Sequence, residues 1–136
     1  MKKRFLYLIL PIITLILEIL PYGAVCNFMR PSTTEGVPAG RFRELYSYFD
    51  LTPFGYANFA PFITAIISCL IFVLLMIYCI KGNVRTANKV KNILYVGVII
   101  SLCPLVFGIT YFSLVGVLIT LSLIGELLLL QFTIKK

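Results

Sequence analysis

Four long apolar runs are the feature that most constrains how this chain of 136 residues can fold. They cover residues 5–24, 59–80, 93–109 and 114–134. Each has the length that a helix needs to cross about 30 Å of hydrocarbon. Within lipid a backbone N–H group must find its carbonyl in its own segment, so isolated runs of this length cross as helices. The runs therefore predict an all-α membrane protein, a four-span antiparallel transmembrane helix bundle.

The composition argues against a soluble domain. Hydrophobic residues make up 60% of the chain and charged residues only 12%. A soluble domain carries about 25% charged residues, because most of its surface must face water. The four runs also lack the polar stripe that the helices of a soluble bundle turn towards the solvent. We expect a single transmembrane domain over residues 1–136, integral to the lipid bilayer of the plasma membrane.

The start of the chain also has features of a cleaved signal peptide, because a short basic segment precedes the first apolar run. Residues 23–26 loosely resemble a lipoprotein cleavage site. Two features favour a retained span instead. Val25 precedes the cysteine, where such sites require a smaller residue, and the apolar run is longer than a typical signal core.

Basic residues are distributed unevenly between the two sides that the spans define. Nine basic residues and no acidic ones lie at the termini and in the loop at residues 81–92. The loop at residues 27–57 holds three basic and three acidic residues. Because basic flanks stay in the cytoplasm, we expect both termini and the 81–92 loop inside and the 27–57 loop outside. This bias explains the formal net charge of +7 without a nucleic-acid partner.

Small residues and one proline predict details of the packing. Pro104 lies inside the third run and removes one helical hydrogen bond, so we expect a kink there. Small residues recur at every fourth position, a spacing that lets helices approach closely. These residues are Ala60, Thr64 and Ser68 in the second run, Gly97 and Ser101 in the third, and Gly116 and Thr120 in the fourth.

The outer loop at residues 27–57 has a pattern of its own. Residues 30–40 are rich in turn-forming types and are expected to be irregular. Phe42, Leu45, Tyr46 and Phe49 then follow the spacing of one helical face. This period predicts a short amphipathic helix over residues 41–50, lying along the outer membrane surface.

Two interpretations of this aromatic loop remain open. Interfacial aromatic residues commonly anchor a membrane protein, so the loop is expected first of all to cover the end of the bundle. It is also a candidate docking surface for a membrane-protein partner, a second copy of the chain or an apolar ligand. The candidate partner-binding residues are Phe42, Leu45, Tyr46, Phe49, Phe54 and Tyr56.

Two carboxyl groups lie within the predicted spans, at Glu18 and Glu126. A charge inside the hydrocarbon costs about 2.5–3.5 kcal/mol even on the most lenient scale, so such residues are functional candidates by default. Glu18 stands near the outer end of its span, and we expect it to reach the outer interface. Glu126 stands deeper, where a structural hydrogen bond and a role in proton or cation transport are equally compatible with the sequence. Gln131 is a second polar group that we expect near Glu126.

Enzymatic chemistry has little support in the sequence. Histidine is absent, and the four cysteines form no Cys-x-x-Cys pair, so we expect no metal site and no cofactor. A quinone-coupled disulfide-forming enzyme needs paired cysteines on the outer side, where only Cys26 is expected. Nor does the chain contain a phosphate-binding loop or a nucleophile motif.

Two functional hypotheses follow. The first is a non-enzymatic subunit, partner-binding or scaffold protein that acts through its aromatic outer loop. The alternative is a small proton- or cation-coupled transporter, or a channel-like oligomer, that uses Glu18 and Glu126. Transport requires a polar path to Glu126, whereas a scaffold would bury it in a dry contact.

Overall fold

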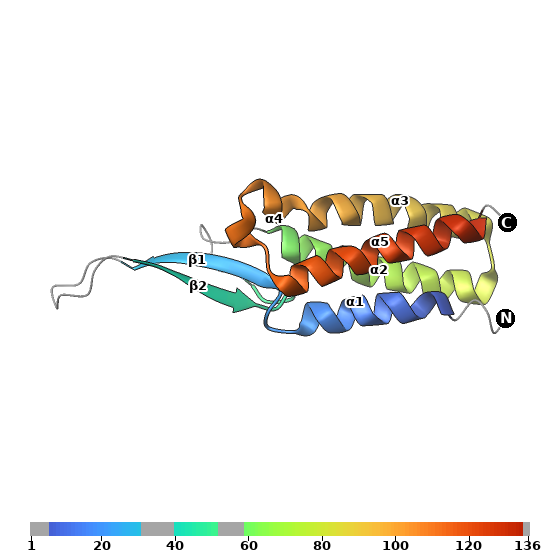
Figure 1. The fold of residues 1–136 in the computed structure, drawn as a ribbon. Coiled ribbons are helices and arrows are strands. Elements are labelled where there is room, and N and C mark those ends of the chain that lie inside the picture. The colour runs from blue at the N-terminus through green and yellow to red at the C-terminus, as the bar shows by residue number, and fades with distance from the viewer. Residues whose placement is uncertain (1–5, 31–39, 52–58, 135–136) are drawn as a thin grey trace.

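The computed structural model describes residues 6–30, 40–51 and 59–134, and it shows a helical bundle with a β-hairpin projecting from one end (Figure 1). The start of α1, the turn between α2 and α3, and the end of α5 lie together at the opposite end (Figure 1). The four long helices are α1 (Ile9–Ile19), α2 (Ala60–Lys81), α3 (Val84–Ser101) and α5 (Leu114–Ile134).

Three of the helical segments are long and apolar enough to cross a membrane, as judged by length and composition. They are Ala60–Lys81, Val84–Val106 and Leu114–Phe132, while the apolar helical segment Leu6–Ile19 is shorter. The helix predicted for the first run ends early because Leu20 precedes Pro21 and adopts an extended conformation with ψ 136°. The proline ring disfavours a helical residue before it, so the end of the first apolar run leaves the helix.

The predicted amphipathic helix over residues 41–50 is wrong. Strand β1 (Ala24–Arg30) pairs antiparallel with strand β2 (Gly40–Tyr46), with Phe28 opposite Phe42. The spacing of Phe42, Leu45 and Tyr46 suits a helix better than a strand, but over so few residues it is a weak signal. The pairing with β1 decides between them, because each strand satisfies the backbone hydrogen bonds of the other. The fold is therefore mostly helical but contains a two-stranded sheet.

The predicted loop at residues 81–92 is also shorter than expected. Gly82 ends α2 with φ 65° and donates from its backbone N–H to the carbonyl oxygen of Tyr78. This left-handed conformation suits glycine at the end of a helix. Asn83 then caps α3, since its side chain accepts from the backbone N–H of Arg85. Consequently Lys81 ends α2, and Arg85, Lys89 and Lys91 lie on the first turns of α3 rather than in a loop.

A kink was expected at Pro104, and the helix is interrupted just before this residue. Helix α3 ends at Ser101, and Pro104 occupies the first turn of the short helix α4 (Cys103–Val106). A proline is tolerated there because it has no N–H group to leave without a partner. The 3-10 helix η2 (Ile109–Tyr111) then carries the chain back towards α5, beside the hairpin.

The small residues at fourfold spacing lie inside the bundle, as predicted. At Gly97 an added Cβ atom would stand 3.1 Å from the Ile67 side chain, so α2 and α3 are in close contact. Small side chains let two backbones approach in this way. The buried members are Ala60, Thr64, Ser68, Gly97, Ser101, Gly116 and Thr120.

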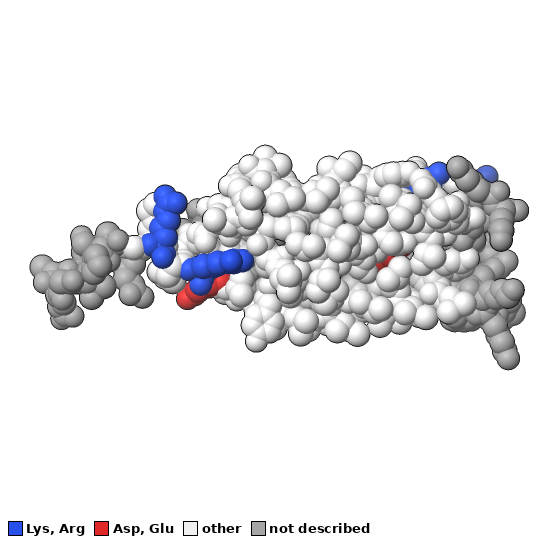
Figure 2. Space-filling model, viewed as in Figure 1, with Lys and Arg blue, Asp and Glu red and all other residues white. Residues whose placement is uncertain are grey.

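Helix α1 has apolar side chains outside and polar ones inside. Its buried residues are Pro11, Thr14 and Glu18, whereas Ile12, Ile16 and other isoleucines are exposed. The side of the bundle in Figure 2 is correspondingly almost free of charged residues, which gather at its two ends. In a water-soluble bundle the polarity of the two faces would be reversed.

The hairpin is held against the bundle by a buried junction. Tyr48 is only 2% exposed, and an added Cβ atom at Gly23 would stand 2.7 Å from the Tyr48 ring. The hydroxyl group of Ser113, just before α5, donates to the carbonyl oxygen of Gly23. The backbone N–H of Gly23 donates to the Tyr46 carbonyl oxygen at 3.1 Å. The close approach of the Tyr48 ring therefore leaves no room for a residue larger than glycine at position 23.

We predict that Gly23→Ala destabilises the protein by about 1–3 kcal/mol, because the new methyl group overlaps the buried tyrosine ring. Thermal denaturation in detergent measures the loss. Gly125→Ala is the matched control, since its added Cβ atom would stand 3.4 Å from Leu10. Equal melting temperatures for Gly23→Ala and the wild type would contradict the tight junction.

Candidate functional site

Five buried polar side chains form a seam that joins α1 to α2 and α5. We call this set the polar seam, and its members are Thr14, Glu18, Ser68, Ser122 and Glu126. Thr14 and Glu18 stand one helical turn apart, so both face the interior of the bundle from the same side of α1. The hydrogen bonds within the polar seam join residues that are far apart in the sequence.

Thr14 is the centre of one half of the seam. Its Oγ1 atom lies 2.8 Å from Oε1 of Glu126, 2.7 Å from Oγ of Ser122 and 3.0 Å from the carbonyl oxygen of Leu10. A hydroxyl group has one proton to donate, so Thr14 donates to either Leu10 or Glu126 at any moment. The Ser122 hydroxyl group can then donate a hydrogen bond to a lone pair of Thr14 Oγ1. The hydroxyl group of Thr14 thereby joins α1 to α5.

Glu18 is the centre of the other half, and its expected place at the outer interface is wrong. It is 0% exposed, and the hydroxyl group of Ser68 on α2 donates to its Oε1 atom at 2.6 Å. The backbone carbonyl oxygen of Glu18 accepts from Ser47 Oγ at 2.9 Å and from the N–H group of Tyr48 at 3.0 Å. One residue therefore joins α1, α2 and the segment that follows β2.

The second carboxyl oxygen of each glutamate, Oε2, is buried and has no hydrogen-bond partner in the described part of the chain. Beside Glu126 there is a cavity of only about 10 Å³. A cavity of roughly this size holds at most one water molecule. Its other lining residues are mainly apolar: Tyr7, Leu75, Leu94, Leu129 and Leu130. Among the described residues, the cavity that Glu126 lines is therefore small and mainly apolar.

Gln131 does not take part in the polar seam. Its side-chain amide donates to the hydroxyl group of Tyr95 on α3. This bond joins α5 to α3 near the end of the bundle that is remote from the hairpin (Figure 1). The network expected around Glu126 is formed by Thr14 and Ser122 instead.

The candidate partner-binding residues lie on or beside the hairpin, except Phe54 and Tyr56, which are outside the described residues. The Phe42 ring stacks on that of Phe28, with ring centroids 5.3 Å apart. Leu45 and Phe49 are exposed, and Tyr46 is half-buried. The strand alternation separates Leu45 from Phe42 and Tyr46, so the single apolar face expected from a helix does not exist.

Tyr46 and Glu44 form a local pair on the face of β2 that also carries Phe42. The Tyr46 hydroxyl group donates to Glu44 at 2.6 Å. This hydrogen bond raises the pKa of Tyr46 to about 12, because it stabilises the protonated phenol. Glu44 is thus positioned by Tyr46, two residues further along the same strand.

A second site, which the sequence analysis missed, lies where the hairpin meets η2. A hollow of about 400 Å³ is lined there by Asn27, Met29, Arg41, Arg43, Thr110 and Tyr111. We call it the arginine hollow. Had residues 41–45 been assigned to a strand, the alternation of arginines with other residues would have placed both guanidinium groups on one face.

Neither metal nor thiol chemistry is supported by the described residues. Among them no group of three or more histidine, cysteine, aspartate or glutamate side chains is placed to hold a metal ion. The Cys26 thiol is buried, and burial raises its pKa, with a further contribution from the charge of Glu44. A reactive cysteine requires the opposite shift, towards the thiolate.

Comparison with known protein families, with curated proteins and with solved structures finds no match for this chain.

We predict that Thr14→Val lowers the free energy of unfolding by about 0.6–1.7 kcal/mol, which are the average and the maximum found for interhelical hydrogen bonds in a membrane protein. The valine keeps the shape of the side chain but removes the bonds to α5. Thr64→Val is the matched control, because the Thr64 hydroxyl donates within its own helix, to the Ala60 carbonyl oxygen. Equilibrium unfolding in mixed micelles compares the two variants. Equal losses would show that the seam adds nothing to the association of the helices.

Proposed function

We propose that this chain is an integral membrane protein with four membrane-embedded helices, and that its projecting hairpin recognises another membrane protein. The bundle acts as the anchor and the hairpin as the binding element. The bundle holds the polar seam in a tight contact, and the described residues of the hairpin offer an exposed strand. No catalytic role is included in the proposal.

The distribution of polarity supports the membrane location. Large apolar side chains are exposed along the sides of the helices, including Ile80, Ile99 and Leu114, whereas serine, threonine and glutamate are buried between them. Exposed apolar surface on this scale is unfavourable in water and favourable in hydrocarbon. Helix α1 shows the same pattern and packs against α2 and α5, so it belongs to the embedded bundle despite its shorter length.

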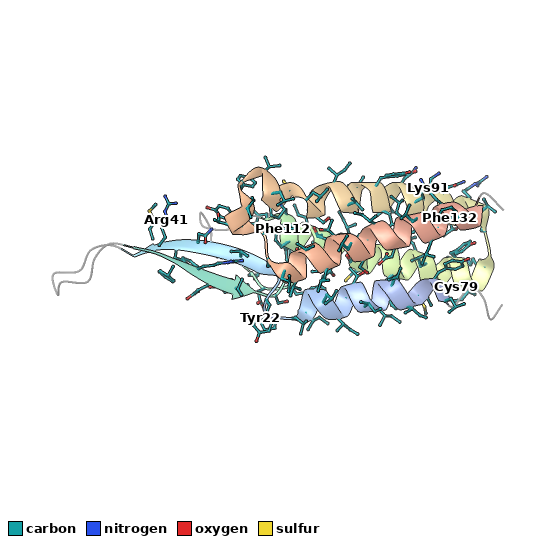
Figure 3. All side chains as sticks on the ribbon, in the orientation of Figure 1. Tyr22, Arg41, Cys79, Lys91, Phe112 and Phe132 are labelled. Carbon is teal, nitrogen blue, oxygen red and sulfur yellow. The ribbon has the colours of Figure 1, made fainter. Side chains whose placement is uncertain are left out.

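The charge distribution supports an orientation with the hairpin outside. In Figure 3 Arg41 lies on the hairpin and Lys91 near the opposite end of the bundle. Lys81, Arg85 and Lys89 stand close to the α2–α3 turn at that opposite end. Because basic residues accumulate on the cytoplasmic side, that end is the cytoplasmic one in this proposal.

The observation that carries the recognition role is the exposure of the projecting hairpin. Every β2 residue from Gly40 to Leu45 is exposed, and Tyr46 is half-buried. Two strands on their own are rarely stable, and each leaves backbone groups available along its outer edge. An edge of this kind, with the Phe28–Phe42 pair beside it, is suited to binding an extended segment or the surface of a neighbouring protein.

The orientation is tested by accessibility labelling in a variant free of native cysteines. A cysteine placed at Met29 on β1 should react with an impermeant maleimide applied to intact cells. A cysteine at Lys89 on α3 should react only after the membrane is opened. Both positions are exposed, so lack of labelling cannot reflect burial within the protein. The reverse pattern would place the hairpin in the cytoplasm and contradict the proposal.

The recognition role is tested by a photoreactive phenylalanine analogue incorporated in native membranes. At Phe42 it should give a discrete protein adduct, whose mass identifies either a partner or a second copy of this chain. At Ile99, on the exposed side of α3, it should react with lipid only. If Phe42 produces the same products as Ile99, the hairpin is not a recognition element.

Proton- or cation-coupled transport remains the alternative, because both glutamates of the polar seam have a buried oxygen without a partner in the described chain. Glu126→Gln distinguishes the two functions, since the amide preserves both the shape and the oxygen that contacts Thr14. For a recognition protein the change is expected to be silent. Loss of a pH-dependent flux in reconstituted vesicles, with normal folding, would favour transport.

A further inference from the structure

The arginine hollow places two basic side chains on one face of the projecting hairpin, beside η2. Arg41 and Arg43 stand two residues apart on β2, so both side chains leave the same face of the strand. Their partners across the hairpin are Met29 and Asn27. The hollow thus combines two guanidinium groups with an amide, and η2 adds the hydroxyl groups of Thr110 and Tyr111.

These two arginines are not neutralised by the acidic residues that lie nearest in the sequence. Glu44 belongs to the opposite face of β2, where it accepts from the Tyr46 hydroxyl group. Asp50 accepts from the backbone N–H of Ser47 at 2.8 Å and so stabilises the turn after the strand. Both carboxyl groups therefore have hydrogen-bond partners other than the two arginines.

One of the arginines is already positioned by the bundle. Arg43 donates from Nη2 to the backbone carbonyl oxygen of Phe112 at 3.3 Å. A guanidinium group has five N–H donors, so this single bond orients Arg43 and leaves donors for a ligand. Arginine binds phosphate and carboxylate groups through such paired donors.

Arg43 also lines a second hollow, of about 480 Å³, which is largely apolar. The other residues that line it are Tyr22, Leu45, Ser113, Leu114 and Val115. Leu114 is 80% exposed at the start of α5, where the apolar side of the bundle begins. A basic hollow and an apolar hollow therefore share one arginine.

We propose that the two hollows together bind one anionic phospholipid. The phosphate group lies in the arginine hollow, on Arg41 and Arg43, and an acyl chain follows Leu114 and Val115 down the bundle. The inference rests on the membrane location proposed above, because in that location the start of α5 at Leu114 lies near the level of the lipid headgroups.

A phospholipid fits this place better than a free anion. A free phosphate would occupy only the basic hollow and leave the apolar one exposed to water. A phospholipid fills both hollows, because it joins a charged headgroup to apolar acyl chains in one molecule.

The test is native mass spectrometry of the full chain in a neutral detergent. The probes are phosphatidylglycerol, phosphatidylcholine with the same acyl chains, and glycerol phosphate. The double variant Arg41→Gln/Arg43→Gln removes the basic hollow. The double variant Arg85→Gln/Lys89→Gln is its matched control, because it removes the same charge from the opposite end of the bundle.

We expect the wild type to retain one phosphatidylglycerol and to prefer it over phosphatidylcholine by on the order of tenfold. The preference should disappear in Arg41→Gln/Arg43→Gln and persist in the matched control. Arg41→Gln alone should also reduce it, and this variant alters no hydrogen bond that the described structure assigns to Arg41. Circular dichroism and melting temperature verify that the variants fold.

Three results would overturn the proposal. The first is an unchanged preference in both double variants, and the second is an equal loss in the two. The third is binding of glycerol phosphate as tight as that of phosphatidylglycerol with the same dependence on arginine, which would indicate a site for soluble anions. A failure of the recognition role would be detected separately, by the cross-linking experiment at Phe42. A failure of the membrane orientation would be detected by the labelling experiment.

Discussion

The polar contacts of α1 determine where the other parts of the molecule lie. Glu18 binds Ser68 of α2 through its side chain, and its backbone carbonyl oxygen accepts from Ser47 and Tyr48, just beyond the hairpin. One turn earlier, Thr14 joins the same helix to α5. A shift of α1 along its axis would break all of these bonds at once. The depth of α1 and the root of the hairpin are therefore set together.

Hydrogen bonds can have this role because the bundle has an unusual distribution of polarity. In the proposed membrane location the hydrophobic effect gives little attraction between helices, since the surrounding lipid chains are as apolar as leucine. Close contact of small residues and buried hydrogen bonds must then hold the helices together. The contact of Gly97 with Ile67 is an example of the first, and the polar seam is an example of the second. Exposed isoleucines on α1 are the complement of its buried polar face.

The division between a closed bundle and an exposed hairpin leads to the functional proposals. In the bundle the glutamates bind neighbouring hydroxyl groups, and the cavity beside Glu126 has room for about one water molecule. On the hairpin, exposed aromatic and basic residues occupy opposite faces of the same strand, with Phe42 on one face and the arginine hollow on the other. The two proposals therefore assign a protein partner to one face of the strand and a lipid headgroup to the other.

The amino-acid sequence by itself determined the helices α2 and α5, the break at Pro104 and the buried faces formed by small residues. These features depend on apolar length, on the proline ring and on a helical period, all of which are local properties of the chain. The burial of Glu126 also follows from its place inside a long apolar run, although the identity of its partners does not.

Only the tertiary structure decided the hairpin, the position of Glu18 and the arginine hollow. Residues 41–46 have an apolar spacing that suits a helix, and they form a strand because β1 supplies hydrogen-bond partners from elsewhere in the chain. Glu18 is buried because Ser68, which is 50 residues away, provides a donor for it. The arginine hollow needs β1, β2 and η2 at one place. Contacts between distant segments create these features, so no local pattern contains them.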